Sequence, residues 1–276
     1  MPIATINGHE MYYEVHGSGP PALCMGGWGT FCHGEERHLA RGLTKNYSVA
    51  IFDHRGVAES GDDFSTTPST RQYADDAIGL LDHLGWKDIH LIGLVGIGAC
   101  IAQEIAIERP DLVRSMVNMG TWARADALFT HQMEMLISTH REMGWEAFQK
   151  LVCLWSFDED FYLENHHRIL GPQGPWKELR GRLPAHERLV QACLTHDVTG
   201  GRLSAIKAPT LVVHCPLDTV TGPRLTKPIE EMIPTARGEV LEGAAHVVAG
   251  SEMRGRFSDM LLGFLAEVDG KREAAQ

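Results

Sequence analysis

Residues 88–104 hold the spacing that most directly suggests chemistry, because a β-branched apolar run breaks into glycines and then continues with helical spacing. A strand that enters a helix through a tight glycine turn lifts one side chain above the edge of an α/β sheet, beside helix N–H groups that can hold negative charge. This is the geometry of a nucleophile elbow, whose pattern is G-x-S-x-G. Residues 93–98 read Gly-Leu-Val-Gly-Ile-Gly, so none of them supplies a nucleophilic hydroxyl or thiol.

The elbow pattern fits this segment in two registers. Counting forward from Gly93 puts Val95 at the nucleophile position, whereas counting back from the helical residues 101–103 puts Gly96 there and Gly98 at the second glycine. We favour the second register because it keeps a close-packed start of the helix at Gly98, where a larger side chain would clash with the preceding strand. In neither register does one restored serine complete the motif, which favours a natural departure over an engineered one.

A second glycine-rich turn, Gly26-Gly27-Trp28-Gly29, follows a short apolar strand at 22–25. Glycines directly after a strand let backbone N–H groups approach a ligand, so one half of an oxyanion hole is expected here. The alternative is a tight turn that binds nothing. Cys100 stands four residues beyond Gly96, about one turn into the helix, and is expected to pack inside rather than to act as an exposed thiolate.

Composition restricts the class of protein. A chain of 276 residues with 43% hydrophobic content fits one large α/β domain with room for an insertion. A net charge of −11 without a basic cluster argues against nucleic acid and an anionic membrane surface, which leaves a small molecule as the expected partner. Residues 1–7 lack the features of a signal peptide, and no apolar run approaches roughly 18 residues, so a soluble cytoplasmic protein is expected. The six cysteines form no C-x-x-C pair, which favours reduced thiols.

Strand and helix patterns alternate on both sides of the elbow, as in βαβ units that build a mostly parallel sheet. The charged turn at 53–60 is interpreted as structural, with Asp53 and Arg55 bonding the backbone or each other. The other expected elements are a hairpin at 2–15 that turns at Asn7-Gly8 and supplies two edge strands, helices at 35–43 and from Ser69 to Gly85, strands at 47–52, 112–119, 209–215 and 238–241, helices at 222–233 and 252–264, and a frayed charged tail at 267–276.

The alternation disappears between Thr121 and Gly201. This stretch has helical spacing and is rich in Met, Trp and His, which predicts a helical lid inserted between one strand and the rest of the sheet. We therefore expect a core formed by residues 1–121 and 202–276, and a cap formed by residues 122–201.

Over about residues 5–265 the chain resembles the α/β-hydrolase superfamily. The matching segments are Gly26-Gly27-Trp28, the turn Phe52-Asp53-His54-Arg55-Gly56, the elbow, Pro209-Thr210-Leu211 and two segments described next. The resemblance implies an α/β-hydrolase fold, a mostly parallel central sheet flanked by helices, with an inserted helical cap. It is closest in style to small-molecule esterases, enol-lactonases and carbon–carbon bond hydrolases.

The resemblance also implies an acid and a base. Asp218 follows the strand after the cap, and His246 closes the turn Gly243-Ala-Ala-His, in the family's chain order. Asp218 would accept the proton-bearing side of the His246 ring and leave the other nitrogen as a base aimed at the elbow. The N–H groups of Trp28 and Ile97 would then stabilise an oxyanion or enolate. Gly27, Trp122 and Trp155 are expected to line the substrate pocket.

Without a serine, the expected dyad can only move protons. His246 could activate water, or remove a proton from the substrate, and Gly96 would leave room for substrate or water. Three hypotheses follow: hydrolysis or carbon–carbon cleavage of a small, cyclic or aromatic carbonyl compound without an acyl-enzyme; a cofactor-independent oxygenase using the same dyad, as in dioxygenases of this fold; and a ligand-binding receptor without turnover, against which the retained Asp and His argue.

No cofactor and no metal is expected. The cap contains His131, His140, His166-His167 and His196-Asp197, but no H-x-x-x-H pair with an accompanying carboxylate. His196-Asp197 is expected instead to tie the cap to the sheet. The sequence does not determine the oligomeric state, and a homodimer stays open.

Overall fold

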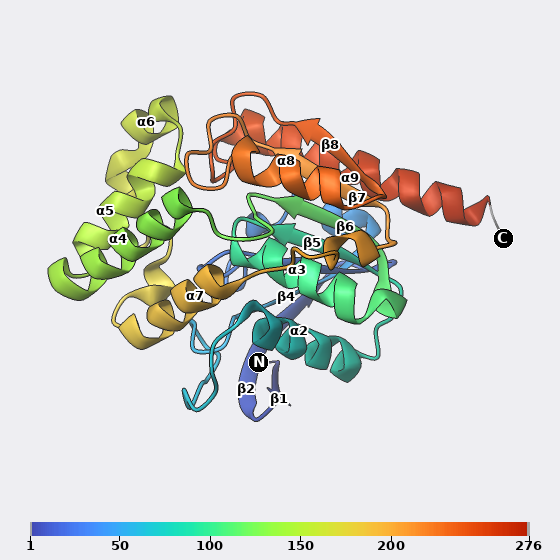
Figure 1. Cartoon of the computed structure of the whole chain (residues 1–276), viewed down its shortest axis with the longest axis horizontal. Coiled ribbons are helices and arrows are strands. Elements are labelled where there is room, and N and C mark those ends of the chain that lie inside the picture. The colour runs from blue at the N-terminus through green and yellow to red at the C-terminus, as the bar shows by residue number, and fades with distance from the viewer. Residues whose placement is uncertain (1, 275–276) are drawn as a thin grey trace.

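The computed structural model describes residues 2–274 and contains one eight-stranded sheet with the order β1-β2-β4-β3-β5-β6-β7-β8 (Figure 1). The first two pairings are antiparallel and the other five are parallel. The strands are β1 (Ile3–Ile6), β2 (His9–His16), β3 (Pro21–Met25), β4 (Ser48–Phe52), β5 (Ile89–Leu94), β6 (Val113–Met119), β7 (Thr210–His214) and β8 (Ala236–Val240). The predicted mostly parallel α/β class is confirmed.

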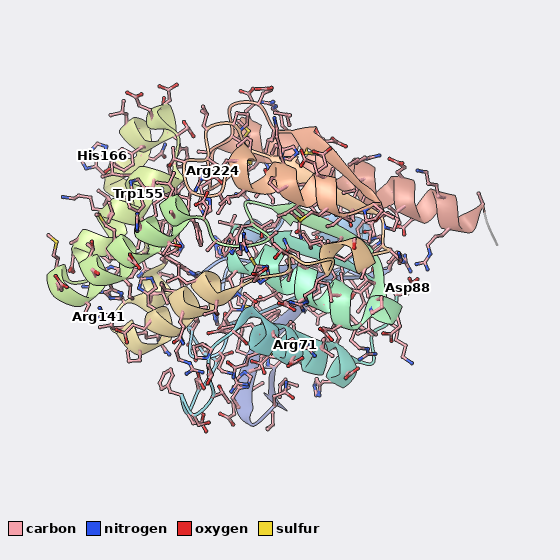
Figure 2. The ribbon with its side chains drawn as sticks, viewed as in Figure 1. Arg71, Asp88, Arg141, Trp155, His166 and Arg224 are labelled. Carbon is pink, nitrogen blue, oxygen red and sulfur yellow. The ribbon has the colours of Figure 1, made fainter. Side chains whose placement is uncertain are left out.

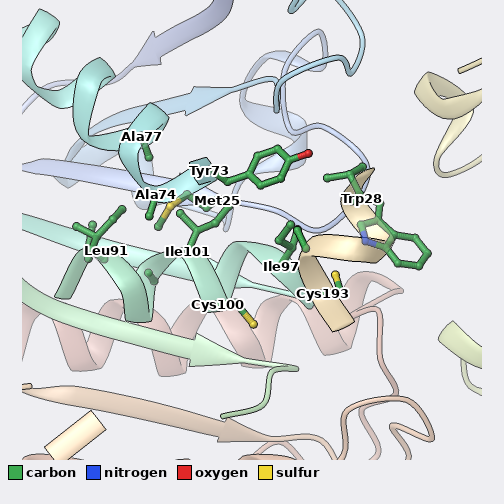
Figure 3. Packing of buried hydrophobic residues seen from close by; sticks show 14 of the residues in the cluster. Met25, Trp28, Tyr73, Ala74, Ala77, Leu91, Ile97, Cys100, Ile101 and Cys193 are labelled. Carbon is green, nitrogen blue, oxygen red and sulfur yellow. The ribbon is translucent and has the colours of Figure 1, made fainter. Parts of the chain in front are cut away.

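Helices cover both faces of the sheet, and the central strands are therefore apolar on both faces. Alternation along β5 sends Leu91 into the core cluster beneath α2 (Thr70–Leu84), α3 (Ile97–Glu108) and α8 (Pro223–Met232), as Figure 3 shows for α2 and α3. Ile92 faces the opposite cluster, beneath α1 (Leu43–Asn46) and α9 (Ser251–Glu273). The elbow thus starts from a strand that is fixed on both sides.

Four α-helices are inserted between β6 and β7, where the sequence predicts a lid. They are α4 (Ala127–Met143), α5 (Trp145–Ser156), α6 (Glu159–Ile169) and α7 (Leu183–Thr195). In Figure 1, α4, α5 and α6 lie together beyond one end of the sheet. Asp126 and Asp158 cap α4 and α6 by accepting the N–H groups of Phe129 and Phe161.

Three predicted features of the fold were wrong for identifiable reasons. The helix expected at 35–43 is a 3₁₀ turn (Glu35–His38) and a separate α1, because Gly42 adopts a left-handed φ of 81° between them. Only β1 of the predicted hairpin is an edge strand, because β2 also pairs with β4. Residues 267–273 are the last two turns of α9 rather than a frayed tail; Asp269 accepts hydrogen bonds from Tyr47 (3.0 Å) and Arg114 (2.8 Å). Residues 275–276 of that predicted tail lie outside the described residues.

The turn after β4 is structural, as predicted, but Asp53 and Arg55 do not bond each other. Arg55 pairs with Asp76 at 2.7 Å, while Asp53 lies 3.0 Å from His33 and accepts the N–H of Glu59 at 3.1 Å. The buried charges on this turn are therefore satisfied separately, that of Arg55 by Asp76 on α2 and that of Asp53 by His33 and the backbone of the turn itself.

Candidate functional site

The turn between β5 and α3 has the backbone that an elbow requires. Gly96 caps α3 with φ 74° and ψ −121°, a conformation that side-chain-bearing residues rarely adopt, and Val95 before it has φ 54°. The N–H of Gly96 donates to Gly120 at 2.6 Å, and its carbonyl accepts the N–H of Ala99 at 3.1 Å, which starts the helix. The sharpest point of the turn is therefore residue 96.

The space available for a side chain at this turn differs between Gly98 and Gly96. A Cβ on Gly98 would stand 2.4 Å from the carbonyl oxygens of Met25 and Gly26, so only glycine lets α3 approach the end of β3. A Cβ on Gly96 would meet only the Trp122 ring, at 4.0 Å, among the described residues outside its two chain neighbours. The turn is thus closed on the side of the sheet and open above residue 96.

The glycine loop, residues 26–29, packs directly against this turn. A Cβ on Gly27 would lie 2.7 Å from the Val95 carbonyl oxygen, so the two turns touch through backbone. The buried His54 ring donates from Nε2 to the Gly26 carbonyl at 3.1 Å and holds the loop from behind. Ile97 is the first residue of α3, so its N–H is one of those that have no acceptor within the helix.

The structure brings together the acid and the base named from the sequence. His246, in the loop after β8, places Nδ1 2.9 Å from Oδ2 of Asp218, in the loop after β7. Asp218 is buried, and its Oδ1 accepts the N–H groups of Val220 and Thr221, each at 2.8 Å. Burial alone would raise the pKa of Asp218, but the charge and hydrogen bond of His246 and the Thr221 donors outweigh it and hold that pKa below its usual range.

An ionised Asp218 determines how the imidazole is protonated. A carboxylate only accepts, so Nδ1 of His246 carries the proton and Nε2 is left as the basic nitrogen. His246 lines a cavity of about 50 Å³ at the elbow, which we call the elbow cavity. Eight of the nine predicted site residues line this cavity: Gly27, Trp28, Val95, Gly96, Ile97, Trp122, Trp155 and His246. The ninth, Asp218, contacts the imidazole of His246.

The rest of the elbow cavity is mostly apolar. The inserted helices close it from above with the side chains of Phe129, Met133, Leu136, Val152 and Cys193. Figure 3 shows Trp28, Ile97 and Cys193 together at one end of the core cluster. A small, mostly apolar cavity strengthens electrostatic interactions with any charge that develops inside it.

Sequence reasoning missed three polar residues near this cavity. Ser156, the last residue of α5, lines it with a buried hydroxyl that has no hydrogen-bond partner within residues 2–274. Its carbonyl accepts the N–H of Val247, next to the base, at 2.8 Å. Thr221 donates to Asp218 at 2.9 Å, and His54 holds the glycine loop. Thr221 could have been found from the Asp-x-x-Thr spacing, and His54 lies in the turn at 52–56 that the sequence singles out, whereas no local pattern marks Ser156.

One Ser–His–Asp group lies away from the elbow cavity. His90 Nδ1 lies 2.7 Å from the Ser115 hydroxyl, and Nε2 lies 3.2 Å from Asp269. His90 and Ser115 are fully buried near the start of β5 and β6, away from the elbow end of these strands, and neither lines the elbow cavity. This group fastens α9 to the sheet.

The remaining expected features are placed as follows. Cys100 is buried, and burial raises the pKa of its thiol well above the usual value. His196 contacts Thr70 at 2.7 Å and Gln103 at 3.0 Å, so it links the inserted segment to α2 and α3 rather than to the sheet itself, as was predicted. Within residues 2–274, the structure contains no group of three His, Cys, Asp or Glu side chains arranged for a metal ion. No described helix is long and apolar enough to cross a membrane.

Two comparisons with known proteins show the family of this chain. The family model Hydrolase_4, described as serine aminopeptidase, S33, matches residues 32–252. RutD of Azorhizobium caulinodans, which bears the provisional name carbamate hydrolase, is 30% identical over 98% of this chain and 100% of its own length. The chain belongs to this family of α/β-hydrolases.

Solved α/β-hydrolase structures share the whole fold. An α/β-hydrolase enzyme from a Medee basin deep-sea metagenome library superposes with a TM-score of 0.85 at 21% identity, covering 96% of this chain and 97% of the other. The enol-lactonase from Burkholderia xenovorans gives a TM-score of 0.80 at 19% identity, covering 96% and 100%. At these identities the likeness shows the fold alone.

Proposed function

We propose that this α/β-hydrolase cleaves a small carbonyl compound by direct attack of water, with His246 and Asp218 as the proton-transfer pair and without a serine acyl-enzyme. The observation that carries the proposal is the pairing of His246 with an ionised, buried Asp218 beside Gly96, which has no side chain to attack a carbonyl. The name of the relative RutD, provisionally a carbamate hydrolase, supports a small carbamate or ester as the substrate.

In the proposed reaction, water occupies the open space above Gly96 and donates one proton to Nε2 of His246 as its oxygen attacks the carbonyl carbon. The carbonyl oxygen becomes an oxyanion, which the N–H groups of Trp28 and Ile97 stabilise. The tetrahedral intermediate collapses by breaking the bond to the leaving group, which takes the proton back from the imidazolium. Asp218 stays ionised throughout and stabilises that imidazolium.

The inserted helices serve as the cap in this proposal. Residues 122–201 would close over the substrate and exclude bulk water, and Trp122 and Trp155 would contact the acyl or leaving group. The substrate is the only partner that the reaction requires, and no step needs a metal or an organic cofactor.

Activity of His246→Ala on small aryl esters, lactones and carbamates tests the proposal. We expect a loss of about 10²- to 10⁴-fold in kcat, the usual contribution of a general base. His166→Ala is the matched control, because His166 lies on α6 at the outer end of the inserted helices (Figure 2) and does not line the elbow cavity. Equal activity of His246→Ala and wild type would overturn the proposal. Consumption of O2 with the substrate would favour the oxygenase alternative, and tight binding without turnover would favour a receptor.

A further inference from the structure

We propose that the substrate carries a carboxylate, bound by a cationic cleft that adjoins the elbow cavity; the inference rests on the proposed function and names its substrate class. The cleft has a volume of about 820 Å³ and shares Gly27, Val95 and Trp176 with the elbow cavity. We call it the arginine cleft. Its cationic residues are Arg37, Arg41, Arg168, Lys177 and Arg254.

The charge of the arginine cleft is opposite to that of the protein. Five Lys and Arg side chains but only two carboxylates, Glu164 and Glu178, line it, in a chain whose net charge is −11. Burial raises the pKa of one of these two carboxylates, Glu178. A concave surface of one sign concentrates ligands of the opposite sign.

The cleft arginines also differ from most arginines elsewhere in how they are bonded. Within residues 2–274, eleven of the fourteen arginines outside the cleft form ion pairs with Asp or Glu. Among the side chains that the structure describes, none of the five cleft cations has a carboxylate partner. Arg254 donates to the Leu39 carbonyl at 3.3 Å, Arg41 to the Ser251 hydroxyl at 3.0 Å, and Arg37 to the Gly34 carbonyl at 3.2 Å. These bonds orient the guanidinium groups without neutralising them.

Two of these groups are close enough to repel each other. Arg41 Nη1 lies 3.7 Å from where a Cβ on Gly255 would stand, beside Arg254 in the chain. Burial and then the positive charge of Arg41 lower the pKa of Arg254. A carboxylate bound between two guanidinium groups would remove this repulsion and gain charge-assisted hydrogen bonds, which are about twice as strong as neutral ones.

The chain connects this cleft to the proposed base. Residues 247–251 run from His246 to the start of α9 and line the cleft, and Arg254 follows one turn into that helix. Val95 and Gly27 border both the cavity and the cleft. A substrate with its reacting carbonyl above Gly96 can therefore extend an anionic end toward Arg41 and Arg254.

A matched pair of esters tests this assignment. Mono-p-nitrophenyl succinate and p-nitrophenyl butyrate share a leaving group and a chain length, but only the succinate ends in a carboxylate. We expect wild type to favour the succinate in kcat/KM by about tenfold or more, and added salt to reduce the preference. Arg41→Gln/Arg254→Gln should lower the succinate-to-butyrate ratio about tenfold. Arg256→Gln is the control, because this arginine lies on α9, bonds the Glu242 carbonyl and does not line the cleft.

Binding of succinate separates this proposal from the proposed reaction. Calorimetry with His246→Ala, alone and combined with Arg41→Gln/Arg254→Gln, measures the cleft without turnover. If His246→Ala binds succinate and the two arginine substitutions abolish that binding, the cleft assignment is supported, even if neither ester is cleaved. Failure to cleave either ester would then overturn only the proposed reaction. An ester ratio near one in wild type, an equal effect of Arg256→Gln, or absence of succinate binding overturns the cleft assignment.

Discussion

Nδ1 of His246 lies 2.9 Å from Oδ2 of Asp218, and two backbone N–H groups hold the other oxygen of that carboxylate. The carboxylate can therefore only accept from the imidazole, which fixes the tautomer that leaves Nε2 basic. The loops after β7 and β8 meet at this contact, so its geometry depends on the pairing of these two strands rather than on one local motif.

Asp218→Asn tests that contact while keeping the shape of the side chain. An amide can donate to Nδ1 and so stabilise the wrong tautomer, as well as losing the charge that stabilises the imidazolium. We expect kcat to fall by about 10²- to 10⁴-fold with little change in KM. Steady-state kinetics on the best small ester or carbamate measures this, and a variant with the wild-type kcat would show that Asp218 does not orient the base.

Gly96→Ser tests both the register of the elbow and the space above it. A serine there would have room, since the nearest described atom to its Cβ, outside the neighbouring residues, is 4.0 Å away. The positive φ should cost about 1–3 kcal/mol of unfolding free energy. We expect this variant to bind one equivalent of a fluorophosphonate, seen by intact mass.

Val95→Ser is the matched control for that experiment. The carbonyl of Val95 faces Gly27, and residue 95 precedes the sharpest point of the turn. Labelling of Val95→Ser but not of Gly96→Ser would reverse the register favoured here.

Ser156→Ala should change stability and activity in opposite directions. The Ser156 hydroxyl is buried in the elbow cavity without a partner within the described chain, so its removal should raise the unfolding free energy by about 1 kcal/mol. If the hydroxyl bonds the substrate, kcat/KM should fall about tenfold in the same variant. Denaturant unfolding and steady-state kinetics check the two effects, and a less stable variant with unchanged kinetics would assign Ser156 a structural role only.

Much of this fold was predictable because its signals are local. Ser69 and Gly85 cap α2 at its two ends, and the apolar run of β5 is followed by glycines, of which Gly98 allows close backbone contact. The last two turns of α9 were missed because the contacts of Asp269 with Tyr47 and Arg114 come from distant parts of the chain. The charged sequence at 267–273 alone carries no apolar period that would show them.

The acid and the base of the candidate site were predictable from the sequence, but the rest of the site was not. Asp218 and His246 were named from motifs, and the structure brings them into contact. Ser156 and the arginine cleft were not visible, because the residues involved come from the loop after β3, the inserted helices and α9, and only the fold assembles them. Sequence spacing identifies residues within one turn, but not those that meet across a cavity.

Three buried histidines predict acid sensitivity of the fold. Burial lowers the pKa of His196 and of His186 to about 3 and that of His90 to about 4. The unfolded chain, with histidine pKa values near 6.5, therefore binds more protons between about pH 6.5 and 4, and the folded state loses stability as the pH falls through this window. Each such histidine should cost about 1.4 kcal/mol per pH unit there.

His196→Gln isolates one of these contributions, because glutamine keeps polar contacts to Thr70 and Gln103 without a titrating ring. We expect unfolding free energies of wild type to fall from pH 7 to pH 5 more steeply than those of the variant. Urea titrations at pH 7, 6 and 5 provide the slopes, and parallel slopes would mean that His196 does not titrate on unfolding.

The central claim is that hydrolysis proceeds without a nucleophile on the enzyme. The most direct measurement is the intact mass and residual activity of wild type after incubation with excess fluorophosphonate. We predict an unmodified mass and full activity, with Gly96→Ser labelled under the same conditions as the positive control. Stoichiometric labelling of wild type with parallel loss of activity, at Ser156 or at any other residue, would contradict the account.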